Sequence, residues 1–116
     1  MAVSVLIVDD HDGFRAGARE LLEADGFVVL GEAADGRTAV EATRRLRPDV
    51  VLLDVQLPDF DGFAVAERLA AHADPPTVVL ISSRSREAYR RRLASSPARG
   101  FIPKADLSGE CLAALL

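Results

Sequence analysis

Four consecutive apolar residues, Val50 to Leu53, stand between Asp49 and Asp54, and this run restricts the fold more than any other feature of the sequence. A strand that is apolar on both faces must be covered on both faces, which is typical of parallel strands in α/β proteins. The run therefore predicts a sheet in the middle of the molecule, with helices on either side. It also predicts a carboxylate, Asp54, at the carboxyl end of one strand.

The rest of the chain alternates between short apolar segments and segments with helical spacing. Strands are predicted over residues 2–8, 27–32, 49–54, 77–81 and 101–103. Helices are predicted over residues 12–24, 35–46, 63–73 and 85–94, and a last helix is capped by Ser108 and reaches Leu116. Asp35 is a candidate N-cap. Five such βα units with short connections indicate a doubly wound parallel sheet with helices on both faces.

Length and composition indicate one globular domain, because the chain has 116 residues of which 49 % are hydrophobic and 28 % charged. The single cysteine, Cys111, excludes an internal disulfide and a multi-cysteine zinc site, and it favours a reducing, cytoplasmic setting. No apolar run approaches the roughly 18 residues of a membrane span, and the first residues lack a signal-peptide pattern. We therefore expect no contact with a membrane.

The formal net charge of -4 is unevenly distributed. Residues 1–74 carry 15 acidic and 7 basic side chains, whereas residues 75–116 carry 3 acidic and 7 basic ones. The net negative charge argues against nucleic-acid binding by this chain. The basic part fits an acidic partner, and its arginines lie close together in the sequence: Arg84, Arg86, Arg90, Arg91, Arg92 and Arg99.

Polar groups at strand ends are the candidate functional residues, because ligands of doubly wound sheets bind outside the carboxyl ends of the strands. They are Asp9, Asp10, Asp54, Ser82 and Lys104. Carboxylates gathered at one edge need a compensating cation, and Mg²⁺ prefers carboxylates, waters and phosphate oxygens. The pattern predicts phosphoryl transfer in which an aspartate is the nucleophile. Lys104 would neutralise charge, and the Ser82 hydroxyl would bind a phosphoryl oxygen.

Each of these residues also has an ordinary structural interpretation. An aspartate at a strand end commonly forms a turn or an N-cap, and a lone serine or lysine there is usually a solvated polar group. Phe101, taken singly, is a core residue. Chance would have to bring five polar groups to the one edge where this architecture binds ligands, and this coincidence favours a site.

Four stretches of the chain resemble the receiver domain of two-component response regulators. They occur in the family's order and are residues 8–11, 49–62, 79–83 and 100–104. The second stretch contains an Asp-x-x-x-Pro-x-x-x-Gly turn that begins at Asp54. The resemblance covers the whole chain and implies one receiver domain over residues 1–116, with the flavodoxin-like strand order 2-1-3-4-5 and a shortened last helix.

The resemblance implies that Asp54 accepts a phosphoryl group from a sensor histidine kinase or a histidine phosphotransfer protein. Mg²⁺ would be bound by Asp54, by Asp10 directly and by Asp9 largely through water. The backbone carbonyl of Gln56 would be a further metal ligand. Such a domain is not an enzyme in the usual sense, since it catalyses only its own phosphorylation and dephosphorylation.

The resemblance also implies a switch. Lys104 would pair with the phosphoryl group, Ser82 would turn inward to bind it, and Phe101 would be the aromatic side chain that turns inward with Ser82. Ser83 occupies a position where small residues leave room for the phosphoryl group. The signal would reach a downstream protein on the face formed by residues 84–104, although a merely solvated basic face is the alternative.

The sequence departs from the family pattern after the lysine. In many receivers a proline follows this lysine and the peptide bond between them is cis, whereas here Ala105 follows Lys104. A cis bond before a residue other than proline costs about 2.5–4 kcal/mol, and the sequence leaves its state open. Gln56 and Arg84 occupy positions that, in this family, tune how fast water removes the phosphoryl group.

Other functions fit the sequence less well. A phosphatase of the haloacid-dehalogenase type needs an acidic residue two positions after its nucleophile, where this chain has Gln56. A flavodoxin-like flavin protein would have its phosphate repelled by the acidic residues 9–12. A receiver that only docks, without being phosphorylated, is a third alternative. We expect a monomer or weak dimer that is either a single-domain regulator or the receiver part of a regulator whose DNA-binding domain has been removed.

Overall fold

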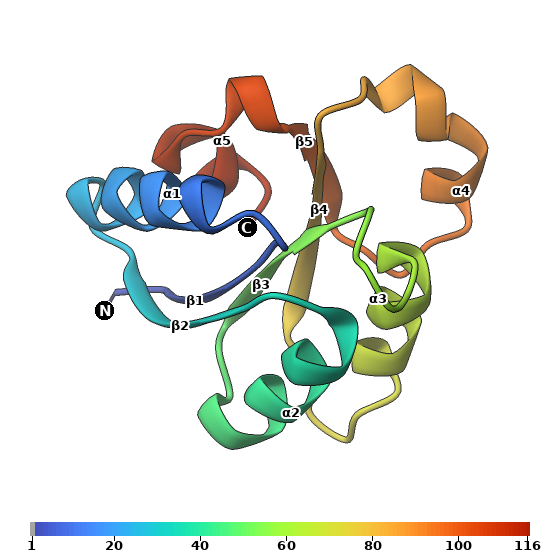
Figure 1. The fold of residues 1–116 in the computed structure, drawn as a ribbon, viewed down its shortest axis with the longest axis horizontal. Coiled ribbons are helices and arrows are strands. Elements are labelled where there is room, and N and C mark those ends of the chain that lie inside the picture. Colours follow the sequence, from blue (N-terminus) through green and yellow to red (C-terminus); the bar gives the residue numbers. More distant parts are fainter. Residues whose placement is uncertain (1) are drawn as a thin grey trace.

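The computed structural model describes residues 2–116 and is built around a five-stranded parallel sheet (Figure 1). Its strands are β1 (Ser4–Val8), β2 (Val28–Ala33), β3 (Val50–Asp54), β4 (Thr77–Ser82) and β5 (Gly100–Pro103). The order across the sheet is β2-β1-β3-β4-β5, and every neighbouring pair is parallel. The predicted architecture and strand order are therefore confirmed, and each strand lies within two residues of its predicted bounds.

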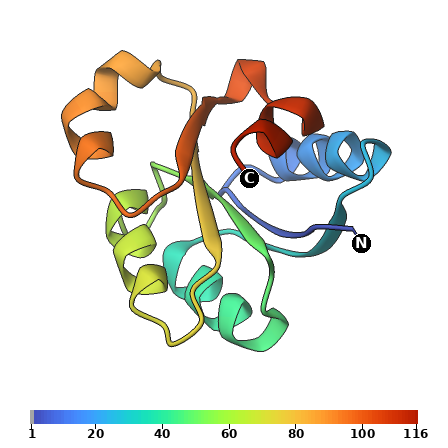
Figure 2. The ribbon, with the colours of Figure 1, turned by 180° about the vertical axis from the view of Figure 1, so that it is seen from behind.

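Helices cover both faces of the sheet, as a doubly wound fold requires (Figures 1 and 2). They are α1 (Asp12–Ala24), α2 (Gly36–Leu46), α3 (Gly62–Ala70), α4 (Arg90–Ala94) and α5 (Gly109–Ala114), with short 3-10 helices η1 (Arg86–Tyr89) and η2 (Lys104–Asp106). Buried side chains of α1 and α5 pack on one face, and those of α2, α3 and η1 pack on the other. No helix within residues 2–116 combines the length and apolar character needed to cross a membrane.

Strand β3 lies at the centre of the sheet and explains why the run Val50–Leu53 is apolar throughout. Val51 and Leu53 belong to the core on the α2 and α3 side, whereas Val50 and Leu52 belong to the core on the α1 and α5 side. All five residues of β3 are buried. Successive side chains of a strand point to opposite faces, so a strand covered by helices on both faces buries every position.

Helix α5 ends at Ala114, two residues before the predicted end at Leu116, and two other helices differ from their predicted bounds for local reasons. Helix α3 ends at Ala70, before the predicted end at Ala73, because its last N–H groups turn to carbonyls three residues back, as Ala71 does with Arg68. The predicted helix over residues 85–94 is a 3-10 turn followed by one turn of α-helix. Tyr89 is its only buried residue, and so little apolar surface does not stabilise a longer helix.

The amino end of α2 ties the loop after β3 to the rest of the molecule. Asp35 accepts a hydrogen bond from the Thr38 N–H at 2.8 Å, which confirms the predicted N-cap. The carboxylate of Asp59, in the loop between β3 and α3, accepts from the N–H groups of Gly36 and Arg37 at 2.8 and 3.0 Å. Burial acts to raise the pKa of Asp59, but these N–H groups outweigh it and lower the pKa. Asp59 thereby anchors the loop that follows the carboxyl end of β3 to the amino end of α2.

Candidate functional site

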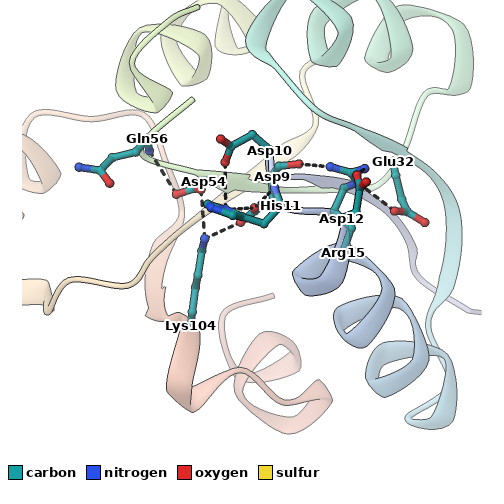
Figure 3. Close-up of polar contacts among 9 residues, drawn as sticks. All are labelled: Asp9, Asp10, His11, Asp12, Arg15, Glu32, Asp54, Gln56 and Lys104. Atoms are coloured by element: carbon teal, nitrogen blue, oxygen red, sulfur yellow. Dashed lines mark hydrogen bonds and ion pairs between the residues drawn. The ribbon is translucent and has the colours of Figure 1, made fainter. Parts of the chain in front are cut away.

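Three carboxylates meet where β1 and β3 end. Asp54 is the last residue of β3, and Asp9 and Asp10 follow β1, which pairs with β3 so that Val8 lies opposite Leu53. Asp9 and Asp54 are buried, with 0 % and 3 % of their surface exposed, whereas Asp10 is exposed. One potential ligand atom from each of Asp9, Asp10, His11 and Asp54 lies within 4.8 Å of all the others. The sequence-predicted aspartates therefore form one cluster (Figure 3).

Lys104 joins the two buried carboxylates. Its Nζ lies 2.5 Å from Oδ2 of Asp9 and 3.1 Å from Oδ2 of Asp54 (Figure 3). It is the only lysine in the sequence, and it is placed at the site because β5 ends at the neighbouring Pro103. Burial acts to lower the pKa of Lys104, but its contacts with both carboxylates outweigh burial and raise the pKa. All peptide bonds within residues 2–116 are trans, including the bond between Lys104 and Ala105.

The two buried carboxylates differ in acidity. Burial raises the pKa of Asp54 by more than the Gln56 N–H and the Lys104 ammonium lower it. Burial also acts to raise the pKa of Asp9, but Lys104 and the N–H of His11 together outweigh it, so that this pKa is lowered. Asp54 is therefore the more basic of the two, which suits a nucleophile.

The cluster fits a divalent cation. Oδ2 of Asp9 is buried and makes no hydrogen bond within residues 2–116, although the Lys104 ammonium lies beside it. The single Lys104 ammonium is shared between the buried carboxylates of Asp9 and Asp54, so a divalent cation would offset the charge that remains. Carboxylate oxygens at a partly open edge, such as those of Asp9, Asp10 and Asp54, are the ligands that Mg²⁺ prefers.

His11 and Gln56 also touch the cluster. Nδ1 of His11 lies 3.2 Å from Asp9 Oδ1 and 3.1 Å from Asp10 Oδ1, a contact that sequence reasoning missed. The signal was available, since His11 directly follows the acidic pair. The backbone N–H of Gln56 donates to Asp54 Oδ1 at 3.1 Å, whereas the metal-binding role of its carbonyl stays a prediction.

The predicted switch residues lie on β4 and β5. Ser82 ends β4, next to Ile81, which is the register partner of Asp54 in β3. Its hydroxyl is buried and lies 3.1 Å from the hydroxyl of Tyr89, a contact that sequence reasoning missed. Ser83 is exposed. Phe101, which was predicted to turn inward with Ser82, is already inside, with 1 % of its surface exposed.

Arg15 supports the acidic loop from α1. Its Nη1 donates to the backbone carbonyl of Asp9 at 2.5 Å, its Nε lies 3.0 Å from Glu32 Oε1, and its guanidinium also pairs with Asp12 (Figure 3). Arg19 reaches the other oxygen of Glu32 at 2.8 Å. Arg15 thus links the residue that follows β1 to the end of β2. The sequence alone does not indicate this contact, since it depends on how α1 packs against two strands.

We expect Glu32→Gln to lower the free energy of unfolding by about 1 kcal/mol at pH 7. The hydrogen bond from Arg19 holds the pKa of Glu32 below its ordinary 4.5, against the effect of burial and with the help of Arg15. A lowered folded-state pKa contributes stability that is present above the unfolded value and lost as the pH falls through the folded one. Urea unfolding at pH 7 and about pH 3 checks this. A difference between variant and wild type that persists in acid would contradict it.

The arginine cluster is only partly available to a partner. Arg92 pairs with Asp61 at 2.5 Å, and its guanidinium carbon lies 4.2 Å from the centre of the Phe63 ring. Arg86 donates to the backbone carbonyl of Phe101 at 2.7 Å. These two arginines attach the segment 86–94 to the body of the protein. The proposed downstream face stays a prediction.

Comparison with known proteins identifies relatives along almost the whole chain. The model of the response regulator receiver domain family matches residues 5–115. A protein-glutamate methylesterase/protein-glutamine glutaminase from Alkalilimnicola ehrlichii is 41 % identical over 115 residues, which is 95 % of this chain and 29 % of that protein. The virulence regulator BvgA from Bordetella pertussis is 36 % identical over 100 residues, which is 86 % of this chain and 48 % of BvgA.

A solved structure has the same fold. The receiver domain of the putative response regulator NarL from Mycobacterium tuberculosis superposes with a TM-score of 0.86 at 33 % sequence identity. The match covers 98 % of this chain and 96 % of that one. The chain thus spans nearly all of a solved receiver domain, whereas it spans less than half the length of the methylesterase and of BvgA.

Proposed function

Because this chain belongs to the family of response regulator receiver domains, the phosphoacceptor part of two-component signal transduction, we propose that Asp54 is the residue that becomes phosphorylated. The observation that carries the proposal is the Asp54 carboxylate, which is buried, joined to Lys104 and within reach of Asp9 and Asp10. Among the other aspartates within residues 2–116, only Asp9 shares these features. Asp9, the other buried carboxylate, lacks the raised pKa of Asp54.

Phosphorylation is a displacement at phosphorus. An oxygen of Asp54 attacks the phosphorus of a phosphohistidine, so that a P–O bond forms while the P–N bond breaks and the imidazole leaves with the electron pair. The Gln56 N–H fixes Oδ1 of Asp54, while the Lys104 ammonium beside Oδ2 neutralises charge on the transferred group. Attack by water later returns the carboxylate and releases phosphate. On this proposal the domain catalyses only its own phosphorylation and dephosphorylation.

Asp9, Asp10 and Asp54 would hold Mg²⁺, together with the backbone carbonyl of Gln56. When bound, the ion would neutralise these carboxylates and the oxygens of the phosphoryl group. The close spacing of the cluster, in which one ammonium is shared between two buried carboxylates, supports this assignment.

The partner that supplies the phosphoryl group is a sensor histidine kinase or a histidine phosphotransfer protein. We propose that this domain meets its partner in the cytoplasm. The phosphorylated domain would act through a downstream protein that contacts residues 84–104. A phosphatase of the haloacid-dehalogenase type is less consistent with the site, since Gln56, in the place of the general acid, is exposed and not ionisable. A docking-only receiver would have no use for the complete acidic cluster.

The proposal is tested by incubating the protein with acetyl phosphate and Mg²⁺ and measuring its intact mass. We expect a gain of one phosphoryl group, loss of this gain when EDTA removes the metal, and a modified peptide that contains Asp54. Acetyl phosphate also acetylates amines, and Lys104 is the only lysine, so the mass must be assigned to phosphoryl and not acetyl. No gain with Mg²⁺, or a gain on another residue, would overturn the proposal.

A further inference from the structure

The hydroxyl of Ser82 makes two hydrogen bonds in this structure. It accepts a hydrogen bond from the N–H of Arg84 at 3.0 Å and shares another with the hydroxyl of Tyr89 at 3.1 Å. A serine hydroxyl has one proton to donate and two lone pairs. Both contacts are buried or partly buried, so water does not readily replace them. A Ser82 hydroxyl that turns toward a new acceptor therefore leaves its contact with Tyr89, whichever of the two hydroxyls donates in that contact.

Tyr89 attaches the segment 86–94 to the sheet. Its ring packs between those of Phe63 and Phe101, with centroid separations of 5.8 and 5.9 Å. It is the only buried residue of η1, and α4 has none. A segment with so little buried surface depends strongly on its few anchors. The hydroxyl of this main anchor is the group that contacts Ser82.

We propose that Tyr89 is a positioning residue whose hydroxyl holds the Ser82 hydroxyl in the position seen here, in competition with a phosphoryl group on Asp54. The inference rests on the proposed function. Hydrogen bonds to a charged phosphoryl oxygen are roughly twice as strong as neutral ones, so the phosphoryl group wins the competition. Once Ser82 leaves, the buried hydroxyl of Tyr89 loses its partner, which disfavours the present packing of the segment 86–94.

The test compares the binding of beryllofluoride, a phosphoryl mimic, in wild type and Tyr89→Phe, with Mg²⁺ present. The variant removes the hydroxyl and keeps the ring. One neutral hydrogen bond corresponds to a change of about 2- to 10-fold, so Tyr89→Phe should bind beryllofluoride about 2- to 10-fold more tightly, as measured by NMR titration. Equal or weaker binding by the folded variant would overturn the inference.

A second pair of variants isolates the hydrogen bond. In a Ser82→Ala background the phenylalanine substitution should leave the affinity unchanged, because the partner of the hydroxyl is already gone. The same gain in both backgrounds would mean that Tyr89 acts without Ser82 and would refute the proposal. If wild type failed to bind beryllofluoride at all, the proposed function would be refuted. This outcome differs from those that refute the role of Tyr89.

A measurement on the wild-type chain needs no variant. Binding of beryllofluoride should speed amide hydrogen exchange in residues 86–94, because their anchor loses its hydrogen bond. Exchange in α2, which makes no contact with Ser82 or Tyr89 through a hydrogen bond, serves as the internal reference. Unchanged or slower exchange in residues 86–94 would contradict the competition between the phosphoryl group and Tyr89.

Discussion

Replacing Asp54 with asparagine should abolish the phosphoryl modification without lowering the stability of the protein. Asparagine has no carboxylate oxygen to attack phosphorus, but its amide oxygen still accepts the hydrogen bond from the Gln56 N–H. Burial raises the pKa of Asp54, so its ionisation weakens the folded state as the pH rises through that pKa. Removing the charge removes this cost. Intact mass after treatment with acetyl phosphate, and the melting temperature at pH 7 without metal, check both expectations.

Asp49→Asn is the matched control, since Asp49 directly precedes the strand that Asp54 ends. Its carboxylate accepts hydrogen bonds from the N–H and hydroxyl of Ser4 at 2.9 and 3.0 Å, at the amino ends of the strands, away from the acidic cluster. This variant should be modified as wild type is. If Asp54→Asn still gained the phosphoryl group, the acceptor would lie elsewhere. If Asp54→Asn melted well below wild type, its loss of modification would reflect unfolding.

The acidic cluster could be predicted from the sequence because it depends on strand ends alone. Parallel strands share one carboxyl edge, so the residues that follow β1, β3 and β5 must approach one another whatever the details of packing. Asp9, Asp54 and Lys104 therefore meet as expected. The buried positions of β3 and its place between two helical layers follow instead from the apolar run Val50–Leu53.

The supporting contacts could not be predicted in this way. Arg15 reaches the carbonyl of Asp9, and Tyr89 reaches Ser82, only because a helix packs at a particular height and rotation against the sheet. One shift of a helix by a residue would move either side chain to another neighbour. In the sequence Tyr89 is a lone aromatic residue among arginines, which gives no indication of a polar contact.

Asp59 shows the same limit. Its residue type suits a turn, and its position in the loop after Pro58 agrees with that role. Its carboxylate also caps α2, a helix that begins 23 residues earlier in the chain, at Gly36. A cap from within the same helix, such as Asp35, follows a local pattern. A cap supplied by a distant loop depends on the tertiary structure.

Gly62→Ala should lower the free energy of unfolding by about 3 kcal/mol and impair the site as well. Gly62 begins α3, and its N–H donates to the carbonyl of Val55 at 2.7 Å, which closes the loop after β3. A Cβ at this position would lie 2.3 Å from the carbonyl oxygen of Asp54 and 2.7 Å from Cα of Val55. These are backbone atoms of a buried segment, so they move only if the end of β3 moves with them.

Gly17→Ala is the matched control and should act in the opposite direction. Gly17 lies in α1, and an added Cβ would meet no atom within 4 Å, so alanine should raise stability by about 0.5–1 kcal/mol through helix propensity. Urea unfolding of both variants measures the change in the free energy of unfolding, which should be negative for Gly62→Ala and positive for Gly17→Ala. The shift of Asp54 in Gly62→Ala should also slow its modification by acetyl phosphate, since the carboxylate no longer faces Lys104 as it does here. Wild-type stability in Gly62→Ala would mean that the loop after β3 closes in some other way, and the geometry assigned to Asp54 would then be wrong.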